Sequence, residues 1–455
     1  MLRGRFPRNP PIGCELVIVV SRLSDCTTSN VARSRPGEAQ VARGSKAVTT
    51  ELEFEQILRD RNVDTVFQPI VDLESMSTTG YEALVRGPVG SPFESASALI
   101  EAAYRTDHVV EFDWAARASA SRAAMAGLNP DLLLFVNVEP LALGSECPRD
   151  LWPDIERAFR MFRIVLEVTE RSLDREPGSL LDGIARQRPE VEALALDDVG
   201  ATTKTLSMLP VLSVDVLKLD RSVTQGGTTP AAMKILDIAY EEGERTNARI
   251  LAEGIETEAQ SRYARMFGAS LGQGYHFGKP GPLPRHVHDL TSLPEIANAT
   301  VPDIRTPFEA LAGRTIGRAN AEILIPLARQ VAHGGVELIE PALVIVLVPR
   351  PEVFTAADQQ RLAELARRGV ITGALGPGLP VEPVAGARGA HSPDPTFAGE
   401  WAVVALSPSS AAAMLARTVP GTASQFEFGV THDRTRVIAA ARCLLRRLAP
   451  PPEPG

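Results

Sequence analysis

Residues 249–277, RILAEGIETEAQSRYARMFGASLGQGYHF, contain the alternation that decides the fold. An apolar run, Arg249–Ala252, is typical of a short buried strand, and Ser270–Phe277 forms a second such run. Between them, Glu256–Phe267 has the apolar spacing of an amphipathic helix. A strand, a helix and a strand in this order predict a parallel βαβ unit.

The same alternation extends from about residue 50 to about residue 282 and contains eight β-rich runs. The other six runs are Thr65–Val71, Gly80–Val85, Leu132–Val138, Ile164–Val168, Ala193–Asp197 and Asp215–Leu219. Eight strands interleaved with helices predict a (β/α)8 TIM-like barrel in the α/β class. About eight residues join the first two runs, which is too few for a parallel crossover, so we expect the first strand to pair antiparallel with the second.

The rest of the chain predicts a second, smaller α/β domain. We expect helices at Ala319–His333, Thr355–Arg368, Ser409–Thr418 and Arg436–Arg447, with strands at Ala342–Val348, Trp401–Leu406 and Phe426–Thr431. The predicted domain boundaries are a disordered N-terminal segment (1–47), the barrel (48–285), a linker (286–307), the second domain (308–449) and a disordered tail (450–455).

Composition narrows the classes of function. The 455 residues carry a net charge of −9, which argues against binding of duplex nucleic acid because that partner needs a basic surface. No apolar stretch reaches the roughly 18 residues of a membrane span, so we expect no membrane partner. The four cysteines are scattered and form no CxxC pair, which fits a reducing compartment and a cytoplasmic protein.

Polar residues stand at the ends of successive predicted strands of the barrel. They are Glu82, Asn137, Glu167, the pair Asp197 and Asp198, Lys218, Glu253 and Gln273. Catalytic groups of barrels come from the C-terminal strand ends, which meet at one mouth. Any one of these carboxylates alone is more often a helix cap or a solvated loop residue. Together, with no His or Cys among them, they predict a site for two hard cations, Mg²⁺ or Mn²⁺, that can clamp a phosphodiester.

These stretches, together with their neighbours, resemble the EAL family of cyclic-di-GMP phosphodiesterases from about Phe67 to Pro280. The matching motifs are QPI at 68–70, YEALVR at 81–86, LEVTE at 166–170, DD at 197–198, LKLDR at 217–221, AEGIET at 252–257 and QGYHFGKP at 273–280, with Asn137 between the second and third. The resemblance implies hydrolysis of one ester bond of cyclic-di-GMP to give linear pGpG.

The resemblance also implies a role for each matching residue. Glu82, Asn137, Glu167 and Asp197 would hold the first metal ion, and Asp198 and Glu253 would complete the two-metal site. Lys218 would orient or activate the attacking water, so that Glu82, Lys218 and Glu253 form the catalytic set. Gln273 would support the site on the substrate side, Gln68 and Arg86 would contact the dinucleotide, and Glu170 would brace the loop after the fifth strand. A homodimer through the barrel is compatible with the resemblance.

The loop after the two aspartates departs from the family pattern. The family usually has Phe-Gly-Thr/Ala-Gly-Tyr-Ser-Ser there, whereas this chain reads VGATTKT at 199–205. In the family that loop links metal binding to dimerisation. An active phosphodiesterase remains the leading hypothesis because all predicted metal ligands are present. The alternatives are a protein that binds cyclic-di-GMP without cleaving it and a regulatory scaffold that binds no nucleotide.

The C-terminal region resembles the DICT sensory domains found beside cyclic-dinucleotide enzymes. The resemblance depends on DPTFAGEWAVVAL at 394–406, the helix expected after it, Phe426–Asp433 and the closing helix. It implies that a sensory domain regulates the barrel.

Overall fold

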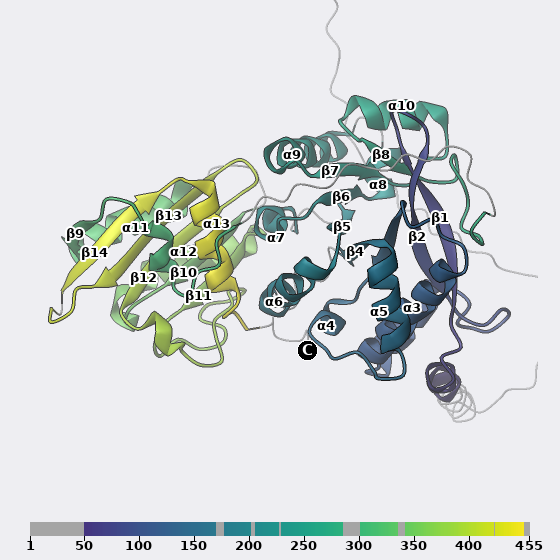
Figure 1. Ribbon diagram of the computed structural model, residues 1–455. Helices are drawn as coiled ribbons and strands as arrows, with labels where there is room; N and C mark the ends of the chain where they lie inside the picture. The colour runs from purple at the N-terminus through teal and green to yellow at the C-terminus, as the bar shows by residue number, and fades with distance from the viewer. Residues whose placement is uncertain are drawn as a thin grey trace, which may run out of the picture. The chain divides into compact units, whose positions relative to one another are not determined.

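The computed structural model describes residues 50–169, 177–201, 205–226, 229–284, 301–334, 342–422 and 424–449. Eight strands close into a barrel in chain order, β1 to β8 (Figure 1). They are β1 (Asp64–Asp72), β2 (Thr78–Arg86), β3 (Leu133–Asn137), β4 (Arg163–Thr169), β5 (Ala193–Val199), β6 (Val216–Leu219), β7 (Arg249–Ala252) and β8 (Leu271–Gln273). The predicted α/β barrel is confirmed, although β8 is shorter than the run Ser270–Phe277.

The first strand is antiparallel to both of its neighbours, as the short β1–β2 connection predicts. Along the β1–β2 ladder Gln68 pairs with Glu82, and on the other edge Ile70 pairs with Gln273. The pairs from β2 to β8 are all parallel. The chain direction of β1 is therefore opposite to that of the other seven strands.

The barrel encloses a layer of apolar side chains. Its members are Ile70, Leu133, Phe135, Val165, Ala193, Ala195, Val216, Leu251 and Leu271, all almost inaccessible to solvent. Successive side chains of a strand point to opposite faces, so the residue two positions further along points into the barrel again. This apolar layer closes the barrel below the mouth.

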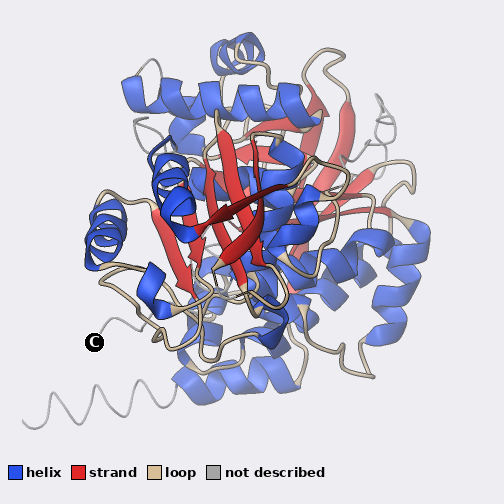
Figure 2. Ribbon diagram, turned by 90° about the vertical axis from the view of Figure 1, so that its left-hand side faces the viewer, coloured by secondary structure: helices blue, strands red, loops and turns tan. Residues whose placement is uncertain are grey.

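Helices alternate with the strands of the barrel along the chain, and Figure 2 colours strands red and helices blue. The longer ones are α2 (Ala96–Arg105), α3 (Val109–Met125), α5 (Trp152–Met161), α6 (Pro177–Gln187), α9 (Pro230–Thr246) and α10 (Glu258–Met266), and the short ones are α4 (Pro140–Leu143), α7 (Leu209–Leu212) and α8 (Arg221–Gln225). The α10 helix begins at a capping box, in which Thr257 and Gln260 each accept from the other's backbone N–H. Glu258, which the sequence places at the start of a helix, lies in its first turn and is exposed.

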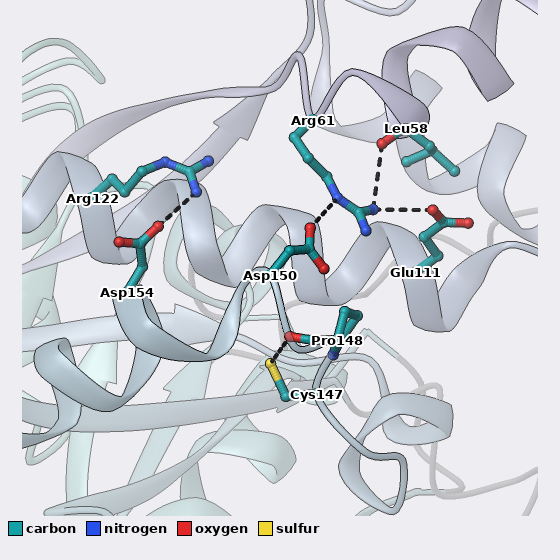
Figure 3. Close-up of polar contacts among 8 residues, drawn as sticks. All are labelled: Leu58, Arg61, Glu111, Arg122, Cys147, Pro148, Asp150 and Asp154. Carbon is teal, nitrogen blue, oxygen red and sulfur yellow. Dashed lines mark hydrogen bonds and ion pairs between the residues drawn. The ribbon is translucent and has the colours of Figure 1, made fainter.

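Charged contacts join the helices on one side of the barrel, as Figure 3 shows. Arg61 contacts Glu111 of α3 at 3.0 Å and Asp150 at 3.4 Å, and Arg122 of α3 contacts Asp154 of α5 at 3.0 Å. All of these groups are at least partly exposed, so each pair contributes at most about 1 kcal/mol. Apolar packing of α3 against α5, through Trp114, Ala118 and Ile155, carries more of the stability.

A second sheet of six strands follows the barrel, in the order β11-β10-β12-β13-β14-β9. Its strands are β9 (Gly317–Asn320), β10 (Leu343–Leu347), β11 (Ile371–Leu375), β12 (Glu400–Leu406), β13 (Ala411–Thr418) and β14 (Gln425–Thr431), and its helices are α11 (Ala321–Gly334), α12 (Ala356–Arg367) and α13 (Arg434–Leu445). Only β10 and β11 pair in parallel. The expected smaller α/β domain is therefore present.

The two faces of this sheet bury different side chains. Ile345 and Val404 point to the face that α13 covers, through Val437 and Leu444. Val344 and Val403 point to the face that α11 and α12 cover. The helices therefore form one layer on each side of the sheet.

One predicted element of the second domain is wrong. We expect a helix at Ser409–Thr418, but Ala411–Thr418 is strand β13, paired antiparallel with both β12 and β14. Alanine favours helix locally, yet pairing on both edges and burial of Met414 and Leu415 outweigh that preference. The helix expected after DPTFAGEWAVVAL is therefore absent, and β9 and β11 are strands that the sequence pattern did not reveal.

Several expectations fall outside the described residues. These are the disordered segment 1–47, most of the linker 286–307, the tail 450–455, Glu170 and part of the loop 199–205. Within the described ranges, every helix is too short or too polar to cross a bilayer.

Candidate metal and phosphodiester site

The positions of the polar residues at the mouth of the barrel are set by the apolar layer beneath them. Phe135, Val165, Ala195, Val216, Leu251 and Leu271 point into the barrel, and the residues two positions later are Asn137, Glu167, Asp197, Lys218, Glu253 and Gln273. Because the side-chain period of a strand is two, these six residues form the next layer. Five of them lie in β3, β4, β5, β6 and β8, and Glu253 directly follows β7.

Lys218 lies at the centre of this polar layer and is fully buried. Its ammonium nitrogen, Nζ, lies 2.7 Å from Oε1 of Glu167, 2.9 Å from Oδ1 of Asp197 and 2.9 Å from Oε1 of Glu253. Oε1 of Glu82 is 3.6 Å away. One cation thus contacts carboxylates from β2, β4 and β5 and from the residue directly after β7, and it offsets part of their mutual repulsion.

Glu82 is held by amide groups on both of its carboxylate oxygens. Nδ2 of Asn137 donates to Oε1 at 3.0 Å, and Nε2 of Gln273 donates to Oε2 at 2.6 Å. Gln273 also approaches Oε1 of Gln68 at 3.3 Å, and Gln68 donates to the carbonyl of Gly278 at 3.1 Å. The structure therefore brings Gln68, Glu82, Asn137 and Gln273 together.

The carboxylates form two overlapping groups, each close enough to share an ion. One group is Glu82, Glu167 and Asp197, and the other is Asp197, Asp198 and Glu253; within each group, one oxygen per residue lies within 4.8 Å of the others. Each group could hold a metal ion, and Asp197 is common to both.

The pKa values of three carboxylates in the cluster shift in different directions. Burial raises the pKa of Glu167 well above its usual value, and Glu82 adds to the rise while Lys218 opposes it. Burial likewise raises the pKa of Glu253 well above its usual value against the opposing effect of Lys218. In Glu82, burial is outweighed by Lys218 and by hydrogen bonds from Gln273 and Asn137, so its pKa is lowered.

Lys218 stays charged in spite of its complete burial. Burial alone would lower its pKa, but Asp197, Glu167, Glu253 and Glu82 together raise it well above the usual value. The cluster therefore favours positive charge at its centre.

Two backbone features shape the edges of the mouth. Asp198 has a left-handed backbone, with φ of +57°, which turns the chain directly after Asp197. Gly274 follows Gln273 with φ of +152°, and a Cβ there would meet the backbone of Ile255 at 2.1 Å. Only glycine permits this approach, so the loop after β8 can pack against the loop after β7.

Not every residue expected at the site joins this set of contacts. Arg86 lies four positions after Glu82 on β2 and donates to the carbonyl of Val85 at 2.8 Å. Glu170 lies outside the described residues. The expected contacts of Arg86 with a dinucleotide and the bracing role of Glu170 stay predictions.

Sequence reasoning missed Asp113, a buried carboxylate on α3. Its Oδ1 accepts from the backbone N–H of Glu139 at 2.7 Å, and its Oδ2 lies 2.5 Å from Nη2 of buried Arg117. Arg117 also lies over the ring of Trp114 at 3.5 Å. Asp113 thereby holds the backbone at Glu139, two residues after Asn137. An i, i+4 acid–base pair within an alanine-rich helix was the available signal.

The donor set fits hard divalent cations. Every candidate ligand offers an oxygen, from a carboxylate or from the amide of Asn137, and the cluster contains no thiolate or imidazole. Oxygen donors of this kind suit Mg²⁺ and Mn²⁺ rather than softer metals.

Comparison with known proteins places this site in a family. Residues 51–280 match the EAL domain. This chain belongs to the EAL domain family. The match ends in the motif that includes Gln273, and it covers all the polar residues of the mouth. The second domain lies outside it.

Two curated relatives of this EAL protein are described as cyclic di-GMP phosphodiesterases, one of them as probable. It is 27% identical over 270 residues to the probable cyclic di-GMP phosphodiesterase PdeN of Escherichia coli K12, covering 55% of this chain and 47% of PdeN. It is 27% identical over 228 residues to the cyclic di-GMP phosphodiesterase RocR of Pseudomonas aeruginosa, covering 48% of this chain and 57% of RocR. The chain thus spans about half the length of these two relatives.

Solved structures also resemble this EAL protein. The PaMucR phosphodiesterase in complex with c-di-GMP is 24% identical with a TM-score of 0.45, covering 51% of this chain and 98% of that one. Klebsiella pneumoniae BlrP1, in a manganese and cy-diGMP complex, is 24% identical with a TM-score of 0.43, covering 48% of this chain and 56% of that one.

Proposed function

We propose that this EAL protein hydrolyses cyclic-di-GMP to linear pGpG with the help of two divalent cations. The observation that carries the proposal is the convergence of Glu82, Glu167, Asp197 and Glu253 on one buried ammonium, that of Lys218. Four carboxylates in one mouth are costly unless cations neutralise them. The family match and the named activity of the relatives support this substrate.

Each residue of the mouth has a proposed task. Glu82, Asn137, Glu167 and Asp197 would hold one Mg²⁺ or Mn²⁺, and Asp198 and Glu253 would complete the site of the second, with Asp197 in reach of both. Bound divalent cations would supply a Lewis acid for the phosphoryl oxygens and a water of lowered pKa. Gln273 would hold Glu82 in its ligand orientation through the 2.6 Å hydrogen bond.

Lys218 would orient the attacking water. Its ammonium lies among the carboxylates that would hold the cations, and it would direct an N–H toward the water. The water adds to phosphorus, one P–O ester bond breaks, and the released 3′ oxygen takes a proton. Gln68 and Arg86 would contact the dinucleotide on the β1–β2 side.

A second candidate function is a receptor that binds cyclic-di-GMP without cleaving it. The specific observation in its favour is the sequence VGATTKT at 199–205, which lacks the second glycine and the tyrosine usual in the family. This segment directly follows Asp197 and Asp198, so a changed conformation there would reach the metal ligands. The complete set of acidic ligands favours catalysis over this alternative.

One experiment separates these functions. Purified full-length protein is incubated with cyclic-di-GMP and Mg²⁺ or Mn²⁺, linear product is followed by chromatography, and binding is measured by calorimetry in Ca²⁺. Turnover that requires the cation supports the phosphodiesterase. Binding without product supports the receptor, and the absence of both would leave the EAL domain as a scaffold.

The second domain has a proposed regulatory role. We propose that it is a DICT-like sensory domain that adjusts the activity of the barrel, within boundaries near 308–449. Its sheet of six strands between helical layers is of sufficient size for an independent core. Deleting residues 308–455 and comparing turnover with that of the full chain tests this role, and an unchanged rate under all conditions would argue against it.

A further inference from the structure

A cleft lies in the second domain, on the face of the sheet that α11 and α12 cover. Its floor is formed by Val344 and Val346 of β10 with Trp401 and Val403 of β12. Ala328 and Ala332 of α11 line one side. Phe354 and, on α12, Leu362 line the other side. The cleft belongs to one domain and is separate from the mouth of the barrel.

Small side chains keep this cleft open. Alpha helices and a sheet normally fill the space between their backbones with interlocking side chains. Here α11 presents Ala328 and Ala332 to the valines of the sheet, and such short groups cannot reach across the layer. The cleft encloses about 60 Å³ and has about 550 Å³ of empty space when its open side is counted. It is therefore large enough for a small organic molecule, part of which would stay near solvent.

The polar groups of the cleft gather on the two helices. Arg329 of α11 binds Asp358 of α12 through two hydrogen bonds, from Nε to Oδ1 at 2.7 Å and from Nη2 to Oδ2 at 3.2 Å. Arg361, one turn after Asp358, is the third charged residue of the lining. Among the described lining residues, two guanidinium groups and one carboxylate sum to a formal charge of +1. Every other lining residue in the part of the chain that the structure describes is apolar.

We propose that the cleft binds a small monocarboxylate with a linear alkyl body, part of which stays near solvent because the enclosed space is limited. The alkyl chain lies along Val344, Val346 and Trp401, from which it displaces water. The carboxylate lies at Arg361 and beside the Arg329–Asp358 pair, where positive charge exceeds negative charge. Arginine suits this task because its planar fork matches a carboxylate. The proposal does not depend on the reaction of the barrel.

Calorimetric titration of the full-length protein with butanoate, hexanoate, octanoate and decanoate tests this site, with the matching alcohols as uncharged probes. We expect saturable binding of octanoate with a Kd below about 1 mM. Affinity should rise about fourfold per methylene until the cleft is full. Each alcohol should bind at least about tenfold more weakly than its carboxylate.

Two variants and two controls locate the binding. Ala332→Phe fills the cleft and should abolish binding, whereas Ala357→Phe makes the same change at an exposed position of α12 and should leave it intact. Arg361→Gln should weaken carboxylate binding about tenfold and leave alcohol binding unchanged, whereas Arg367→Gln, outside the cleft, should do neither. Thermal unfolding of each variant shows that it is folded.

Three outcomes would overturn the proposal. The first is the absence of saturation by every carboxylate up to about 5 mM. The second is equal affinity for alcohols and carboxylates. The third is octanoate binding that stays the same in both Ala332→Phe and Arg361→Gln.

Discussion

The ammonium of Lys218 lies 2.7 Å from a carboxylate oxygen of Glu167, and both side chains are fully buried. The two residues come from β6 and β4, strands that are not neighbours in the barrel. A lone buried carboxylate would lose its charge, and a lone buried ammonium would lose its proton. The surrounding carboxylates keep Lys218 charged, and its ammonium opposes, without cancelling, the rise in the pKa of Glu167 that burial causes.

Glu82→Ala should reduce phosphodiesterase turnover by more than about 100-fold. The change removes a carboxylate that belongs to the first cation group and that accepts from both Asn137 and Gln273. Loss of a group that merely supports a metal ligand costs about 10–100-fold, so loss of a ligand should cost at least as much. Glu258→Ala, at an exposed position in α10, is the matched control and should keep the wild-type rate. A Glu82→Ala protein with full turnover would falsify the metal-site assignment.

Lys218→Met should make the protein more dependent on divalent cations for stability. Without its ammonium, Glu167, Asp197 and Glu253 repel one another, so the metal-free variant should unfold at a lower temperature than the wild type. Added Mn²⁺ should then raise its Tm by more than that of the wild type, because the cation no longer competes with the ammonium and binds the folded state more tightly. Each tenfold gain in affinity adds about 1.4 kcal/mol of stability.

The control for this experiment is Lys234→Met, on the outer helix α9, which should respond to Mn²⁺ as the wild type does. Turnover of Lys218→Met should fall in the same preparation, since the proposed water-orienting group is lost. Equal Mn²⁺ shifts for Lys218→Met and the wild type would show that Lys218 does not share its site with the cations.

Asp113→Ala should destabilise the chain by about 3 kcal/mol, measured by urea unfolding. The change leaves Arg117 buried without its carboxylate and frees the N–H of Glu139. Asp154→Ala breaks the comparable but partly exposed pair with Arg122 (Figure 3) and should cost less than about 1 kcal/mol. Similar losses in the two variants would mean that burial does not distinguish the pairs.

Asp358→Asn should flatten the dependence of stability on acid pH. Partial burial raises the pKa of Asp358, but hydrogen bonds from Arg329 and Thr355 outweigh it, so the pKa is lowered. A carboxyl whose pKa is lower in the folded state stabilises the chain above its unfolded pKa of about 3.9, and this contribution disappears as the pH falls through the folded value. The wild type should therefore lose more stability than the variant as the pH falls below about 4.

Thermal or urea unfolding at pH 7 and at steps below pH 4 provides this measurement. At pH 7 the variant should be less stable by about 1 kcal/mol, because Asp358 also completes the capping box of α12 with Thr355. Parallel stability curves for the two proteins across the acid range would contradict the prediction.

Much of the barrel could be predicted from local sequence alone. The alternation around residues 249–277 gave the βαβ unit, and the short link before Thr78 gave the antiparallel first pair. The second domain was harder to predict, because alanine-rich Ala411–Thr418 takes its structure from two neighbouring strands. Pairing partners that lie elsewhere in the chain cannot be deduced from local propensity.

The sequence by itself determined which side chains could share the mouth of the barrel. With a side-chain period of two, the position of an apolar residue such as Val165 or Val216 fixes that of Glu167 or Lys218 two residues later. Only the tertiary structure decided how these groups meet. Closure of the barrel places Lys218 among carboxylates from β2, β4 and β5 and from the end of β7, and packing of α3 places Asp113 next to the backbone of Glu139. Such contacts join residues far apart in the chain, and their energies depend on burial, which no local pattern specifies.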